Sequence, residues 1–280
     1  MRTGLYVPLF GDWSEPARVV DLARQAEQAG WDGLFVSDHV YGGEGIPVCD
    51  AFVALAAVAS VTTRIRFGTL VTPLARRRPW VVARQTTSVD HLSAGRMIFG
   101  AGIGEDEWQG EMSAFAERAQ DEDERAGLLD ESLAVLLAFW SGKAVRHDGE
   151  WLNVDTAAFL PTPLQHPRIP VWVSARWPRR NPLRRAAHVD GIYPLFTEAD
   201  PSLPPDVAEV RKIRDEVLRL GAPPSHDLVL RGAFGPKFGD EAIDKLMTLE
   251  QAGMSWWLES IGHDEAVSSA IERVNAGPPT

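Results

Sequence analysis

The chain has 280 residues, 45% of them hydrophobic, and carries 28 basic against 39 acidic residues for a formal net charge of −11. This length can bury a full core as one large α/β unit or as two smaller ones. The negative charge repels nucleic acid and anionic membrane surfaces, so neither is an expected partner. No uninterrupted apolar run approaches the ~18 residues that a membrane-spanning helix needs.

The cysteine content and the N-terminal segment both indicate an intracellular protein. Cys49 is the single cysteine, so no intrachain disulfide can form, which suits a reducing cytosol. The first residues, MRTGLYVPLFGDW, lack the apolar segment and cleavage site of a secretory signal peptide. We therefore expect a cytoplasmic location.

Short apolar runs alternate with amphipathic helical stretches along the chain. The expected strands are residues 5–7, 33–37, 64–71, 97–103, 171–174, 191–194, 228–231 and 255–258. The expected helices are residues 15–29, 51–62, 79–92, 122–140, 206–220, 240–252 and 263–275. Residues 141–170 hold four prolines, interrupt the alternation and are interpreted as an insertion. Eight strands, most of them followed by a helix, predict a closed TIM-like (β/α)8 barrel that forms one domain over residues 1–280. The alternative is a doubly wound open sheet.

The second expected strand ends in an acid and an imidazole, Asp38 and His39, directly after Ser37. Active sites of barrels lie at the carboxyl ends of the strands and in the loops after them. Imidazole titrates near neutral pH, and a neighbouring carboxylate can fix its tautomer. By itself this pair fits a polar strand cap as well as an active-site wall, and its place in a barrel favours the active site.

Glycines dominate the ends of the third and fourth strands. The segment GTLVTP, residues 68–73, is by itself compatible with an ordinary turn. In GAGIGEDEW, residues 100–108, glycine at every second position lets a flat ligand or another backbone approach closely. The spacing is not that of a dinucleotide-binding loop. Glu105, which follows these glycines, is expected to point into the same barrel mouth as His39.

The fifth strand leads into a basic segment that contains Ser174, Ala175 and Arg176. Five arginines lie between residues 176 and 185 of an otherwise acidic chain. Backbone N–H groups, a hydroxyl and guanidinium groups together form a plausible phosphate site. A solvated basic start of a helix is an equally good interpretation of these residues alone.

Residues 63–108 (TRIRFGTLVTPLARRRPWVVARQTTSVDHLSAGRMIFGAGIGEDEW) resemble the luciferase-like flavin-dependent oxidoreductases. This family includes luciferase-type monooxygenases and dehydrogenases that use the deazaflavin coenzyme F420. The resemblance extends through residues 31–40 and 168–194 and weakens beyond them. It implies a TIM-like barrel with an insertion, usually a homodimer, and FMN or coenzyme F420 in the barrel mouth.

The resemblance also assigns catalytic residues. It implies that Asp38, His39 and Glu105 serve acid–base roles, and we predict that His39 is the acid or base and that Asp38 orients it. The deazaflavin sugar-phosphate dehydrogenases have a tryptophan a few residues beyond this histidine. Here Tyr41 and a glycine loop stand in its place, so a different substrate class is possible.

The resemblance places the cofactor against two segments of the barrel mouth. Its phosphate is expected at Ser174, Ala175 and Arg176. Its ring is expected on a non-prolyl cis peptide within the run Thr69, Leu70 and Val71, with the glycines of the fourth strand close by. The cofactor-binding residues predicted in this way are Thr69, Leu70, Val71, Gly102, Gly104, Ser174, Ala175 and Arg176.

The functional hypothesis is therefore an oxidoreductase acting on a small organic substrate, with a separate reductase as a possible supplier of reduced cofactor. FMN with oxygen would give a monooxygenase, and F420 would give hydride transfer; the sequence does not choose between them. The alternative is a barrel that binds a flavin without turning it over. A metal-dependent hydrolase is disfavoured because the first strand carries no histidine ligands.

Overall fold

The computed structural model describes residues 1–106, 110–117, 119, 121–196, 203–234 and 239–279. Eight parallel strands form a ring in which each pairs with the next and the last pairs with the first. In ring order they are β1 (Arg2–Val7), β2 (Gly33–Val36), β3 (Arg66–Thr69), β5 (Met97–Gly102), β8 (Val171–Trp177), β9 (Gly191–Phe196), β10 (Asp227–Gly232) and β11 (Trp256–Ser260). The predicted closed barrel is confirmed.

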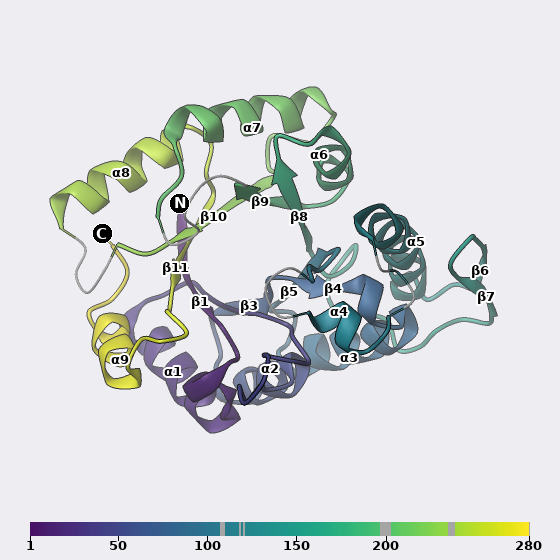
Figure 1. Ribbon diagram of the computed structural model, residues 1–280, viewed down its shortest axis with the longest axis horizontal. Helices are drawn as coiled ribbons and strands as arrows, with labels where there is room; N and C mark the ends of the chain where they lie inside the picture. The colour runs from purple at the N-terminus through teal and green to yellow at the C-terminus, as the bar shows by residue number, and fades with distance from the viewer. Residues whose placement is uncertain (107–109, 118, 120, 197–202, 235–238, 280) are drawn as a thin grey trace.

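Helices surround this ring, as Figure 1 shows. They are α1 (Pro16–Ala29), α2 (Ala51–Val61), α3 (Pro79–Leu92), α5 (Glu122–Trp140), α6 (Arg180–Ala187), α7 (Val207–Arg219), α8 (Asp240–Gln251) and α9 (Val267–Asn275). Their boundaries follow local chemistry. The Asp50 side chain accepts a hydrogen bond from the Val53 N–H at the start of α2, and Gly30 ends α1 in the left-handed conformation. Within the described residues, no helix is long and apolar enough to cross a membrane.

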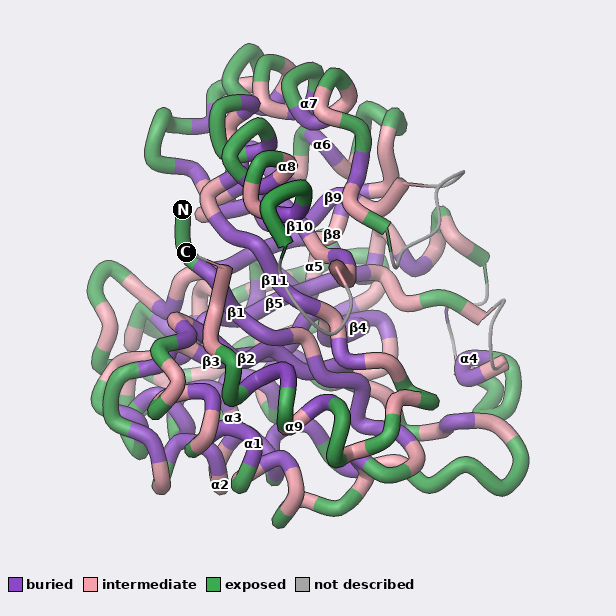
Figure 2. The backbone as a smooth tube through the Cα atoms, turned by 90° about the vertical axis from the view of Figure 1, so that its left-hand side faces the viewer, coloured by how far each residue is buried: buried purple, intermediate pink, exposed green. Residues whose placement is uncertain are grey.

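The core has two layers because alternate residues of each strand face opposite sides. Inside the barrel, Phe35, Trp172 and Trp256 form an aromatic cluster, with ring centroids 4.8–5.6 Å apart. Trp257 belongs instead to the layer between strands and helices, so the two neighbouring tryptophans face opposite sides. Figure 2 shows the central strands buried and the outer surface of helices such as α7 and α8 largely exposed.

Two glycines allow β3 and β5 to approach each other closely. A Cβ atom on Gly68 would lie 1.7 Å from the Ile98 carbonyl oxygen, and one on Gly100 would lie 2.1 Å from the Thr69 carbonyl oxygen. Either contact is far inside van der Waals distance. Glycine at this strand was expected to allow close approach of either a flat ligand or another backbone. At Gly100 the structure shows the second, since the backbone of β3 lies against it.

The structure corrects several predicted boundaries. The third strand does not run through residue 71: β3 ends at Thr69, and a short strand, β4 (Thr72–Pro73), resumes after a cis peptide. The fifth strand, β8, continues to Trp177. The insertion contains the antiparallel hairpin β6 (Val145–Asp148) and β7 (Asn153–Thr156), which projects from the body in Figure 1. Elements missing from the predicted set are the short η1 (Gly11–Ser14), η2 (Leu74–Arg76) and α4 (Glu111–Ala114), and the helix α6, whose basic segment by sequence alone fits either a phosphate site or the start of a helix.

Candidate active site

A cavity of about 600 Å³ opens at the carboxyl ends of the barrel strands. Its volume lies within the range of about 300–1,000 Å³ that is typical of small-molecule sites. Among the residues predicted for the site, those that line it are His39, Leu70, Val71, Gly104, Glu105, Ser174 and Arg176. The other predicted residues, Asp38, Thr69, Gly102 and Ala175, are buried behind its wall.

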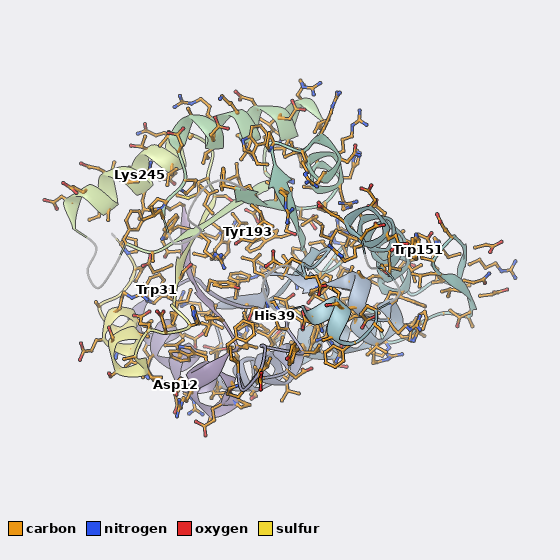
Figure 3. All side chains as sticks on the ribbon, in the orientation of Figure 1. Asp12, Trp31, His39, Trp151, Tyr193 and Lys245 are labelled. Carbon is orange, nitrogen blue, oxygen red and sulfur yellow. The ribbon has the colours of Figure 1, made fainter. Side chains whose placement is uncertain are left out.

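His39 lies on the cavity wall just beyond the end of β2, with its side chain 23% exposed. Its Nδ1 atom is 3.3 Å from Oε2 of Glu111, at the start of α4. The Phe10 ring packs against the imidazole at a centroid distance of 4.8 Å. The contact with the carboxylate fixes the orientation of the imidazole ring on the cavity wall. Figure 3 labels His39 near the middle of the molecule, within the ring of helices.

Asp38 does not orient His39, which corrects the predicted pairing. Its carboxylate is fully buried and binds two arginines that follow β3. Arg77 donates from Nη2 to Oδ1, and Arg76 donates to the Asp38 backbone carbonyl at 2.7 Å and approaches Oδ1 at 3.5 Å. Successive residues at the strand end point to different sides, so Asp38 faces the protein while His39 faces the cavity. Asp38 therefore stabilises the loop that carries His39.

Glu111 contacts both His39 and Arg76, one of the arginines that bind Asp38. One of its carboxylate oxygens accepts hydrogen bonds from the backbone N–H groups of Val40 and Tyr41, and the other approaches Arg76 Nε at 3.7 Å. Burial raises the pKa of Glu111, but the His39 hydrogen bond, the Arg76 charge and the Val40 N–H together hold it below its usual value. The carboxylate is therefore ionised at neutral pH.

Glu111→Gln is expected to reduce stability at pH 7 and to weaken its dependence on acidic pH. The folded pKa of Glu111 lies below the unfolded value of about 4.3. Its contribution is therefore complete above about pH 4.3 and is lost as the pH falls through the folded pKa. Urea unfolding from pH 7 to pH 3 should show a smaller loss for this variant than for wild type.

The matched control is Glu272→Gln on the exposed side of α9. It should leave both the unfolding free energy and its acid dependence as in wild type. Equal acid dependence in wild type and Glu111→Gln would contradict the ionised, buried state of Glu111.

The wall at the ends of β3 and β5 has the predicted non-prolyl cis peptide, between Leu70 and Val71. Gly102 supports this wall from behind: a Cβ there would lie 2.5 Å from Val71 Cγ2 and 2.7 Å from Ser174 Oγ. Gly104 lines the cavity and has a φ of +75°, which favours glycine. The glycines of this strand thus let the Leu70–Val71 peptide and Ser174 border one space.

The basic corner of the cavity is formed by β8 and α6. Ser174 and Arg176 lie within the last half of β8 rather than in the loop after it, and Arg185 joins them from α6. Arg176 Nη1 is 3.6 Å from Glu122 Oε2, and Arg185 binds Asp130. A hydroxyl and guanidinium groups are the donors that a phosphate requires, so these residues fit a phosphate-bearing cofactor.

Several groups that line the cavity were not predicted from the sequence, among them Arg231 and Glu111. Arg231, at the end of β10, could have been found by inspecting every strand end. Glu111 follows a stretch without periodicity, and no local pattern connects it with His39. Among the described residues, no three His, Cys, Asp or Glu side chains are grouped as a metal site would require.

The model of the luciferase-like monooxygenase family matches residues 4–225. The chain belongs to this family. It is 30% identical over 211 residues to the F420-dependent glucose-6-phosphate dehydrogenase of Nakamurella multipartita, covering 74% of this chain and 59% of that protein. The namesake from Microbacterium testaceum is 28% identical over 230 residues, covering 77% and 67%. The chain thus spans only about 59% of the first of these relatives.

Solved luciferase-like structures share the fold. An F420-dependent secondary alcohol dehydrogenase, solved with an F420–acetone adduct, superposes with a TM-score of 0.79 at 17% identity, covering 99% of this chain and 98% of that one. The monooxygenase RslO1 from Streptomyces bottropensis gives 0.75 at 18% identity, covering 99% and 97%. These superpositions establish a common fold, and at 17–18% identity they do not identify the cofactor of this chain.

Proposed function

We propose that this protein is an oxidoreductase that binds coenzyme F420 in the cavity and catalyses hydride transfer to or from a small organic substrate. The observation that carries the proposal is the His39 imidazole, held by Glu111 on the wall of a cavity that also presents the Leu70–Val71 peptide and the Ser174–Arg176 corner. F420 is preferred to FMN because the relatives of about 30% identity are named as F420-dependent enzymes.

The residues of this chain would divide the work as follows. Bound F420 supplies the hydride donor or acceptor. Ser174 and Arg176 would hold its phosphate, and the Leu70–Val71 peptide would support its ring. His39, on the cavity wall, would give a proton to or accept one from a substrate oxygen, while Glu111 keeps its ring oriented. Glu105, on the loop after β5, is the second proposed acid–base group.

Titration of the purified protein with F420 and, separately, with FMN tests this proposal. We expect fluorescence quenching to show tighter binding of F420, and a screen of small alcohols and sugar phosphates to give substrate-dependent F420 reduction. Preference for FMN with oxygen consumption would make the protein a monooxygenase. Binding without turnover of any substrate would favour the non-catalytic flavin-binding alternative, and binding of neither cofactor would refute the proposal. A homodimer and a cytoplasmic location stay predictions.

Arg176→Ala should weaken F420 binding by about 10–100-fold, because a hydrogen bond to a charged group contributes about 1.5–3 kcal/mol. The dissociation constant from the same titration measures this loss. The matched control is Arg146→Ala in the exposed β6–β7 hairpin, whose side chain is 85% exposed. Equal dissociation constants for Arg176→Ala and wild type would exclude the phosphate role.

A further inference from the structure

Arg231 occupies a distinctive place in the barrel. Strand alternation turns its side chain inward, on the same side of β10 as Val229, at the layer that forms the cavity floor. Its guanidinium carbon lies 4.3 Å from the centre of the Tyr6 ring on β1 and 5.9 Å from that of Tyr193 on β9. Figure 3 labels Tyr193 near the middle of the molecule, as it does His39.

Arg231 differs from the other arginines of the cavity in its partners. Arg176 lies beside Glu122, and Arg185 binds Asp130. Among the described residues, Arg231 has no carboxylate within 4.0 Å; its side chain is hydrogen-bonded to Tyr6, and Glu105 lines the same cavity. Burial opposes the charge of Arg231, but the two tyrosines, including a hydrogen bond with the Tyr6 side chain, and the charge of Glu105 together raise its pKa above the usual value, so the guanidinium stays charged at the cavity. Its position therefore suits an anion that enters with a ligand.

Two phenols complete the surroundings of this guanidinium. Burial raises the pKa of Tyr193 above its usual value, although the Arg231 charge acts in the opposite direction. Tyr193 thus keeps its proton and can donate a hydrogen bond, as Tyr6 can from the other side. A guanidinium fork flanked by two phenols matches the two oxygens of a carboxylate, which accepts bidentate hydrogen bonds from arginine.

We propose that Arg231, with Tyr6 and Tyr193, binds a carboxylate group of the substrate and so selects organic acids. The inference rests on the proposed function, because it assigns the Ser174–Arg176 corner to the cofactor and the floor to the substrate. A monoanion is favoured over a phosphate dianion because Arg231 is one guanidinium, the other cavity arginines being assigned to the cofactor corner, and Glu105 lines the same cavity. The aromatic rings beside the guanidinium favour an apolar group attached to the carboxylate.

Calorimetric titration with benzoate, its neutral isostere benzamide and inorganic phosphate tests this site, with and without F420. We expect wild type to bind benzoate at least about ten-fold more tightly than benzamide or phosphate, since one charge-assisted hydrogen bond accounts for such a ratio. Arg231→Gln should abolish that preference and retain F420 affinity. Arg231→Lys should keep part of it, and Tyr193→Phe should weaken benzoate binding without affecting benzamide. Arg146→Gln, in the exposed hairpin, is the control.

The outcomes separate this inference from the proposed function. Equal binding of benzoate and benzamide, a preference for phosphate, or full benzoate affinity in Arg231→Gln would each overturn the carboxylate site. Loss of F420 binding in a folded Arg231→Gln protein would overturn it too, by assigning Arg231 to the cofactor. Should Arg231→Gln fail to fold, Arg231→Lys and Tyr193→Phe decide. Failure of wild type to bind F420 would instead refute the proposed function, whatever the benzoate result.

Discussion

Replacing His39 with alanine is expected to lower kcat by about 10²–10⁴-fold, the usual contribution of a positioned general acid or base. The substitution should spare the loop around it. Glu111 would still accept hydrogen bonds from Val40 and Tyr41 and would still face Arg76. Cofactor affinity should therefore stay near the wild-type value. Steady-state turnover with an active substrate and F420 measures the first quantity, and fluorescence titration measures the second.

Two comparisons make this result specific to the imidazole. His188→Ala, at the exposed end of α6, removes a histidine outside the cavity and should retain full turnover. Added imidazole should partly restore activity to His39→Ala, because the vacated space borders the cavity. Wild-type turnover in His39→Ala would show that the proton is handled elsewhere, with Glu105 as the next candidate.

The architecture could be predicted because most barrel strands are apolar runs followed by a helical pattern. The predicted ends of the third and fifth strands were wrong, because residue composition does not show where the backbone leaves or keeps the strand conformation. RIRFGTLV reads as one strand, yet the chain turns at the Leu70–Val71 peptide before β4. The segment after Ser174 suggested a loop, yet β8 continues to Trp177 because Trp172–Trp177 pair with β9. Neither the turn at the Leu70–Val71 peptide nor the continuation of β8 depends on the spacing of hydrophobic residues, so that spacing could not predict them.

The position of the site could be predicted from the sequence, but the side chains that contact its residues could not. His39 could be found because strand ends meet at one side of a barrel. Its carboxylate partner could not, because Glu111 lies 72 residues away and reaches it through the fold. Sequence adjacency suggested Asp38 in its place. Adjacent residues at a strand end face different surroundings. Here Asp38 faces two buried arginines, and His39 faces the cavity.

Asp38→Asn tests whether Asp38 stabilises the loop or takes part in proton transfer. The Asp38 carboxylate has no solvent exposure, and the side chains of Arg76 and Arg77 that bind it are 3% and 13% exposed. Asparagine keeps the shape and removes the charge, so two mostly buried guanidinium groups lose their shared counter-ion. Removing one partner of a buried ion pair costs about 3–5 kcal/mol. We expect urea unfolding to show a loss of this size and thermal unfolding to shift downwards by roughly 10 °C, at about 2–4 °C per kcal/mol.

The control for this substitution is Asp21→Asn on α1, which disrupts the exposed pair with Arg24 and should change stability by less than about 1 kcal/mol. Turnover measured well below the unfolding transition decides the role of Asp38. If Asp38 only stabilises the loop, kcat falls far less in Asp38→Asn than in His39→Ala, because Glu111 continues to orient the imidazole. Unchanged stability combined with a fall in kcat equal to that of His39→Ala would instead make Asp38 a direct partner in proton transfer. The loop would then have to rearrange when ligand binds, since its present geometry commits Asp38 to the two arginines.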